Sequence, residues 1–278
     1  MPYSDLCREK ILSEDYHDFI VSDIRMPFLQ DMLEKDCCLQ NPGFFYQCAY
    51  LSKSVIKPVS LENYSYFSIP KCYSLLSMQA LNQVGILPIQ NHSTIQLSGK
   101  QVMIGFLDTG IDYQNPVFQH LDKTTRIAGI WDQTIQSGTP PESFDYGSHY
   151  TPDMINEALA SEDPYSLVPS VDNNGHGTFL ASIAAGSGDP DAQFIGAAPE
   201  SVIAVVKLKQ AKQYLRDYYF IPNTAPAFQE NDIMLGMRYL HLLAEKLGLP
   251  LIFCLALGSN LGGHSGSLPL SIIAQQYT

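Results

Sequence analysis

A histidine framed by two glycines is the first residue of the sequence that suggests chemistry. The stretch NNGHGTFLAS, residues 173–182, places His176 directly before a threonine and an apolar run. An imidazole can act as general acid and base near neutral pH, and small neighbours let backbone and ligand approach its ring closely. A lone histidine can also be a buried core residue whose hydrogen bonds are all made. The catalytic interpretation therefore depends on finding a side chain that could act together with the imidazole.

A carboxylate that could partner His176 stands at the end of an apolar run. Residues 102–107 read VMIGFL and are followed by Asp108 in DTGID. Such a run is typical of a parallel strand buried on both faces, and open α/β sheets bind ligands at the carboxyl ends of these strands. His176 opens a predicted helix that is closed by Gly186. We therefore expect Asp108 and His176 to meet at the sheet edge, with a carboxylate oxygen about 2.6–3.2 Å from Nδ1.

Further strands and helices after residue 97 would build the sheet that positions this pair. The stretches SVIAVVKL (201–208) and PLIFCLALGS (250–259) predict a second and a third buried strand, and LPLSIIAQQYT begins a further helix. A long helix is predicted over 228–248. Its apolar face consists of Ile233, Met237, Leu240, Ala244 and Leu247. The alternation of strands and helices predicts an α/β fold with a parallel sheet flanked by helices.

Residues 1–96 have a different texture and predict a small α+β unit. They contain five of the six cysteines, the strand-like pieces HDFIV (17–21) and YFSIP (66–70), and one amphipathic stretch, MPFLQDMLEKD (26–36). A short helix is predicted over 75–86, followed by a polar connector. We therefore divide the chain into residues 1–96 and residues 97–278.

Composition excludes several classes of function. With 16 Lys and Arg against 28 Asp and Glu, the net charge is -12, so nucleic acids and anionic membranes are not expected partners. KLKQAK (207–212) is interpreted as a solvated strand end. No stretch of 18 apolar residues predicts a membrane span, and the acidic start is not a secretory signal. The cysteines lack paired CxxC spacing, which favours reduced thiols in a cytoplasmic protein and no metal site; no cofactor is expected.

The pair of motifs DTGID and NNGHGT resembles the subtilisin-like serine peptidases, or subtilases. The resemblance covers residues 99 to 278 and implies an incomplete subtilisin-like sheet, in which Asp108 orients His176 and His176 serves as general base and then general acid. It also implies that residues 1–96 are a propeptide that chaperones the peptidase domain and blocks its cleft, with peptides or proteins as substrates. LALGS (255–259) resembles the substrate-binding strand, so Ala256, Leu257 and Gly258 are the expected substrate-binding residues.

Two further stretches, TRIAGIWDQTI (125–135) and GSNLGGHSGS (258–267), resemble the subtilase branch of spore-forming bacteria, which includes spore-germination peptidases. This branch implies a cytoplasmic or spore-associated protein. Ordinary packing of Trp131 in a loop is the alternative interpretation of the first stretch.

The third member of the triad is not evident in the sequence. Subtilases carry the nucleophile in a GTS segment, after a strand that bears the oxyanion asparagine, and neither matches this chain. Ser265 as nucleophile and Asn260 as oxyanion donor are weaker alternatives, since position 267 is not the glycine of a GxSxG elbow. Two functions stay open: a serine endopeptidase, inactive as this chain alone, and a non-catalytic pseudopeptidase that binds through the same cleft. No GxSxG serine precedes Asp108, which argues against an α/β hydrolase.

Overall fold

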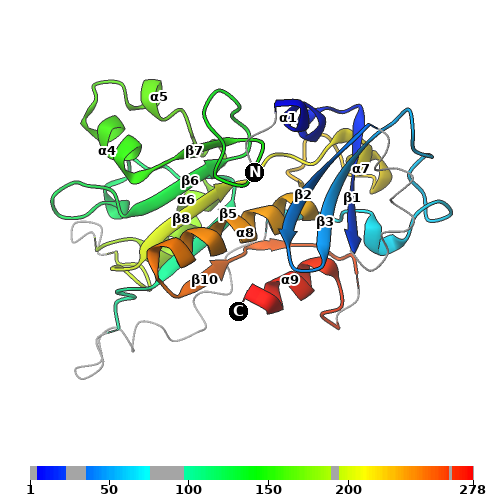
Figure 1. Ribbon diagram of the computed structural model, residues 1–278. Helices are drawn as coiled ribbons and strands as arrows, with labels where there is room; N and C mark the ends of the chain where they lie inside the picture. The colour runs from blue at the N-terminus through cyan, green and yellow to red at the C-terminus, as the bar shows by residue number, and fades with distance from the viewer. Residues whose placement is uncertain (1–4, 23–35, 76–96, 189–193, 263–264, 278) are drawn as a thin grey trace.

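The computed structural model describes residues 5–22, 36–75, 97–188, 194–262 and 265–277. Residues 5–75 contain a small antiparallel sheet, and the residues from 97 onward surround a larger, mostly parallel sheet (Figure 1). No described residue before Met103 contributes a strand to the larger sheet. The boundary predicted at residues 96 and 97 follows the stretch 76–96, which lies outside the described residues.

The central sheet has five strands in the order β10-β5-β8-β6-β7. Their bounds are β5 (Met103–Asp108), β6 (Ile127–Asp132), β7 (Ser148–Tyr150), β8 (Val202–Lys207) and β10 (Leu251–Cys254). The first four strands in this order run parallel, and β7 pairs antiparallel with β6. All six residues of β5 are buried, as are the four middle residues of β8. The α/β fold with buried central strands is therefore confirmed.

Helices cover both faces of this sheet. Alternate β5 side chains face opposite ways: Met103 and Leu107 share an apolar cluster with α8 (Glu230–Leu247), while Ile104 and Phe106 share one with α6 (His176–Ala185). The expected apolar face of α8 is buried except at Leu247, which is 44% exposed because the last turn leaves the core. The remaining helices of this region are η4 (Pro116–Phe118), α4 (Pro152–Ala160), α5 (Pro164–Leu167), α7 (Gln213–Tyr218) and α9 (Pro269–Tyr277).

The predicted third buried strand is wrong in its burial and its length. Its first part, β10, lies at the edge of the central sheet as described, so Ile252 is 55% exposed. Its second part forms a separate two-residue strand, β11 (Leu257–Gly258), which belongs to another sheet. An edge strand has one side open in the plane of the sheet, and among the described strands β10 pairs only with β5.

Trp131 lies in strand β6, so its placement in a loop is wrong. The indole is fully buried, and its Nε1 donates a hydrogen bond to the Tyr146 carbonyl oxygen at 3.0 Å. The rings of Phe144 and Tyr239 pack against it. Its role is core packing, as the alternative interpretation held.

The small sheet consists of β1 (Tyr16–Ser22), β3 (Tyr46–Ser52) and β2 (Cys37–Gly43), in that order, with α1 (Asp5–Leu12) beside it. It packs against α8 and lies near α9, where the Tyr277 hydroxyl donates to the Pro42 carbonyl oxygen at 2.7 Å (Figure 1). HDFIV lies within β1, as predicted.

Four expectations for residues 1–96 are wrong or untested. YFSIP begins as a 3-10 turn, η2 (Tyr66–Ser68), because five alternating residues carry too little signal to specify a strand. Cys7 and Cys38 form a disulfide that joins α1 to β2, contrary to the expected reduced thiols. The stretch 26–36, apart from Asp36, and the helix predicted over 75–86, apart from Leu75, lie outside the described residues.

KLKQAK is not a solvated strand end. Lys209 and Lys212 are 9% and 4% exposed, because Asp232 and Asp18 lie against them as ion-pair partners. A further finding concerns membranes: among the described helices, none is both long and apolar enough to span a bilayer.

Candidate active site

Asp108 and His176 meet at the carboxyl edge of the central sheet. Asp108 is the last residue of β5, and His176 is the first residue of α6. The Asp108 carboxylate oxygen Oδ1 lies 2.8 Å from His176 Nδ1, as predicted. This contact fixes the orientation of the imidazole ring at the sheet edge.

The Asp108 carboxylate is buried, with a relative exposure of 1%. Its Oδ1 also accepts a hydrogen bond from the Thr109 backbone N–H at 2.7 Å. Burial raises the pKa of Asp108 above its ordinary value, while the contacts with His176 and Thr109 oppose that rise. A buried carboxylate in contact with an imidazole stabilises the cation that forms when the imidazole takes a proton.

The first turn of α6 is fixed by a carboxylate from the preceding loop. Asp172 Oδ2 accepts hydrogen bonds from the backbone N–H and the hydroxyl of Thr178, at 2.8 and 2.7 Å. Its Oδ1 accepts from Gly175 N–H at 2.9 Å. Asp172 thus satisfies N–H groups that a helix start leaves without partners. The pKa of Asp172 is lowered: burial would raise it, but these hydrogen bonds outweigh the burial.

The second framing glycine allows β5 and α6 to approach each other. A Cβ atom at Gly177 would lie 2.2 Å from the Gly110 carbonyl oxygen and 3.2 Å from the Asp108 Cβ. The Gly177 N–H donates to Thr109 Oγ1 at 2.9 Å, which joins the two segments directly. Only glycine fits this contact. The first glycine, Gly175, has a φ of 82° in the left-handed region, where it caps the helix.

The expected substrate-binding residues border a short antiparallel sheet near this edge. Leu257 and Gly258 form β11, and Ala256 precedes them. β11 pairs with β4 (Cys72–Leu75), in the register Leu257 to Leu75 and Gly258 to Ser74. β4 belongs to residues 1–96, which we call the N-terminal segment. We call the space between β11 and β9, which β4 fills, the groove.

Sequence reasoning missed the strand on the other side of the groove. β9 (Phe228–Gln229) pairs antiparallel with β4, Cys72 opposite Gln229 and Tyr73 opposite Phe228. Phe228 and Gln229 fall within the helix predicted over 228–248, and that prediction is wrong for these two residues. The acidic residues Glu230 and Asp232 in the first turn of α8 are a local signal that the helix begins at residue 230.

The weaker candidates for a nucleophile and an oxyanion donor both lie at the surface. Ser265 is exposed, and its hydroxyl shares a hydrogen bond with the Ser267 hydroxyl at 2.9 Å. Asn260 is also exposed. Neither environment resembles a preorganised site, in which the donors are fixed and shielded from water.

One group of potential metal ligands occurs in the described parts of the chain. Cys7, Cys38 and Asp145 place their ligand atoms within 4.8 Å of one another. The two sulfur atoms are joined in the disulfide, and a metal would need them as thiolates.

Comparisons with known proteins show which family this chain is similar to. Residues 99–234, which include both Asp108 and His176, match the subtilase family. The Subtilisin-like proteases SBT2.2 and SBT2.1 of Arabidopsis thaliana are 32% and 30% identical to this chain, each over 40% of it and 15% of their own length. The solved structure of the Clostridium perfringens CspB protease is 33% identical, with a TM-score of 0.57, over 69% of this chain and 36% of that one.

This chain thus spans about a third of the solved neighbour and less than a sixth of the curated relatives. The matched span includes β5, β6 and β8 of the central sheet and both residues of the contact between Asp108 and His176. Through residues 99–234, the chain thus matches the subtilase family.

Proposed function

We propose that this chain supplies the aspartate and the histidine of a serine endopeptidase that hydrolyses peptide bonds through an Asp-His-Ser triad. The observation that carries the proposal is the 2.8 Å contact between Asp108 Oδ1 and His176 Nδ1 at the sheet edge. In this proposal Asp108 holds the ring and stabilises its cation. His176 takes the proton of the attacking serine and then gives it to the leaving amine.

A peptide substrate would bind in the groove as an extended strand. The pairing of β4 with β9 and β11 supports this, because it places an extended segment between two strands with backbone hydrogen-bonding partners on both sides. Leu257 and Gly258, with Ala256 next to them, would form one wall, and Phe228 would stand on the other. Since β4 belongs to residues 1–96, the same pairing supports the N-terminal segment as an intramolecular inhibitor.

The nucleophile can be tested with a fluorophosphonate probe, which labels only an activated serine. We expect the chain of residues 1–278 to remain unlabelled and to hydrolyse no peptide above background. We expect a longer chain that includes a GTS segment to be labelled and active, and Asp108→Asn in that chain to reduce turnover by about 10⁴-fold. Stoichiometric labelling of the shorter chain that Ser265→Ala abolishes would instead identify Ser265 as the nucleophile.

The same experiment separates the peptidase from a non-catalytic binding module. A longer chain that binds peptides in the groove but resists the probe would support the pseudopeptidase. The intact pair favours the peptidase, since recognition alone does not require an imidazole oriented by a buried carboxylate. A cytoplasmic or spore-associated location stays a prediction from the sequence.

A further inference from the structure

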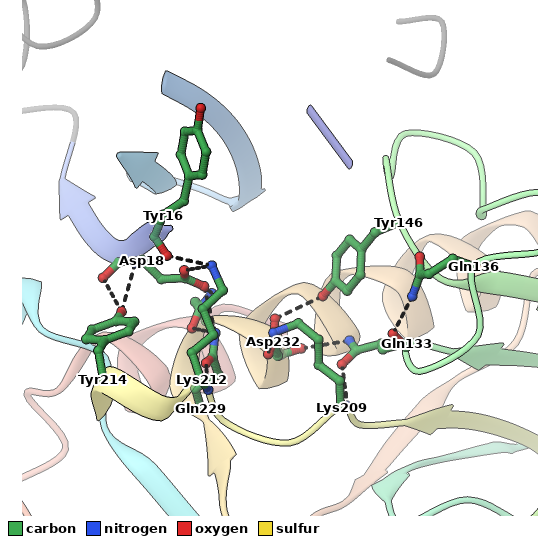
Figure 2. A network of polar contacts seen from close by, with 11 residues as sticks. Tyr16, Asp18, Gln133, Gln136, Tyr146, Lys209, Lys212, Tyr214, Gln229 and Asp232 are labelled. Atoms are coloured by element: carbon green, nitrogen blue, oxygen red, sulfur yellow. Dashed lines mark hydrogen bonds and ion pairs between the residues drawn. The ribbon is translucent and has the colours of Figure 1, made fainter. Parts of the chain in front are cut away.

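Strand β1 of the N-terminal segment places a buried carboxylate against residues at the start of α7 and of α8. Asp18 is 1% exposed, and Figure 2 shows polar groups from the larger region converging on it. The Lys212 ammonium forms an ion pair with its Oδ1. Its Oδ2 accepts hydrogen bonds from Gln229 Nε2 at 2.7 Å and Asn231 Nδ2 at 3.0 Å. Three donors therefore meet one carboxylate.

The same surroundings also hold the backbone of β1. The Tyr214 hydroxyl accepts a hydrogen bond from the Asp18 N–H at 2.8 Å and donates to the Asp18 carbonyl oxygen at 2.9 Å. Lys212 Nζ donates to the Tyr16 carbonyl oxygen at 3.0 Å. We call Lys212, Tyr214, Gln229 and Asn231 the carboxylate pocket. It contacts both an acidic side chain and the strand that carries it.

Lys212 depends on Asp18 for its counter-charge. The neighbouring acid, Asp232, is engaged by Lys209, whose Nζ lies 2.6 Å from Asp232 Oδ2. Burial lowers the pKa of Lys212, and Asp18 opposes that shift. A buried ammonium without its partner is strongly destabilising, so an empty pocket would be unfavourable unless the lysine moved or another anion entered.

Gln229 connects the pocket to the groove. Its backbone lies in β9, opposite Cys72 of β4. Its side chain is fully buried: Oε1 accepts from the Lys212 N–H at 3.0 Å, and Nε2 donates to Asp18. The next residue, Glu230, donates its N–H to the Lys71 carbonyl oxygen at 2.7 Å, just before β4. Gln229 therefore binds the Asp18 carboxylate through its side chain and pairs through its backbone with β4, the strand that fills the groove.

We propose that the carboxylate pocket recognises an acidic side chain on an extended strand, and that Asp18, by filling it, fixes β9 in the position that pairs with β4. The partner it fits is the N-terminal segment, and docking of β1 and pairing of β4 are then coupled through Gln229. This inference rests on the proposed function in taking the groove as the substrate-binding site.

Hydrogen exchange measured by mass spectrometry on the whole chain tests the coupling. We expect Asp18→Asn to speed exchange at residues 71–73 and 228–230 on the order of 100-fold, because it leaves Lys212 buried without its anion. Exchange in β5 and β8 should change less than about threefold. Asp15→Asn, an exposed carboxylate three residues away, is the matched control and should change neither region.

A second variant distinguishes the loss of this ion pair from a general loss of folding. Asp18→Asn combined with Lys212→Met removes both charges, and we expect exchange at residues 71–73 and 228–230 to return to within about tenfold of the original chain. The proposal is overturned if Asp18→Asn leaves these residues unchanged, if it speeds β5 and β8 equally, or if the double variant exchanges as fast as the single one. These readings need no turnover, so they hold or fail independently of the peptidase activity.

Discussion

Acidification should weaken the attachment of β1 through His17, which neighbours Asp18. The His17 ring stacks on Tyr214, with ring centroids 3.9 Å apart and planes 15° from parallel. Neither ring nitrogen has a hydrogen-bond partner among the described residues. Burial, together with the charges of Lys53 and Lys212, lowers the pKa of His17 from 6.5 to about 4, although Asp18 acts in the opposite direction. The folded protein therefore favours the neutral ring.

This shift makes stability depend on pH in a defined window. Above pH 6.5 the ring is neutral in both states and contributes no difference. As the pH falls from 6.5 towards 4, His17 binds a proton in the unfolded chain but stays neutral in the folded chain. The free energy of unfolding therefore decreases. At pH 5 the full shift corresponds to about 2 kcal/mol. Because His17 as a whole residue is only partly buried, we expect a loss of about 1–2 kcal/mol.

Urea unfolding at pH 7.5 and pH 5 measures this loss, with the fluorescence of the single, fully buried Trp131 as the signal. His17→Phe is the matched variant, since it keeps the stacked ring and removes the titration. Other titrating groups affect both chains, so the difference between them isolates His17. We expect the original chain to lose about 1–2 kcal/mol more than the variant on going to pH 5. Equal losses in the two chains would refute this reasoning.

Two substitutions in the larger region should also change stability. Gly177→Ala places a methyl group against the Gly110 carbonyl oxygen and should cost about 1–3 kcal/mol in thermal or urea unfolding, whereas Gly188→Ala, with its nearest contact at 3.8 Å, should stay within about 0.5 kcal/mol; equal effects would contradict the steric argument. Arg126→Met leaves three carbonyl oxygens without the guanidinium that donates to them at 2.7–3.2 Å, so unfolding should become easier by about 2–4 kcal/mol, and a change below about 1 kcal/mol would count against it.

The parts of this fold that sequence alone predicts are those specified by neighbouring residues. The apolar run before Asp108 predicts β5, and the residues before His176 together with Gly186 predict the start and end of α6. Both predictions depend on local signals, because a strand buried on two faces needs a continuous apolar run and a helix needs its caps. Their order along the chain then places the carboxylate and the imidazole at one sheet edge.

The predictions that fail depend on residues far away in the chain. Nothing near Lys212 indicates that it is buried, since its counter-ion, Asp18, lies 194 residues earlier. β9 is only two residues long and becomes a strand through its pairing with Cys72 and Tyr73. β10 lies at the edge of the sheet because it pairs only with β5 among the described strands, and its apolar sequence does not indicate this position. Tertiary context overrides the local pattern in each case.

The pair of Asp108 and His176 depends on contacts between nearby residues, whereas the groove depends on contacts with distant residues. The contact between Asp108 and His176 is held by residues 108–112 and 172–178, through short-range caps and the close approach at Gly177. Pairing in the groove is held by Asp18 and β4, which belong to the N-terminal segment. Loss of Asp18 should therefore change what lies in the groove while the distance between the carboxylate and the imidazole stays near 2.8 Å. Under the proposed function, removal of β4 would therefore open the groove to a substrate without rebuilding the pair.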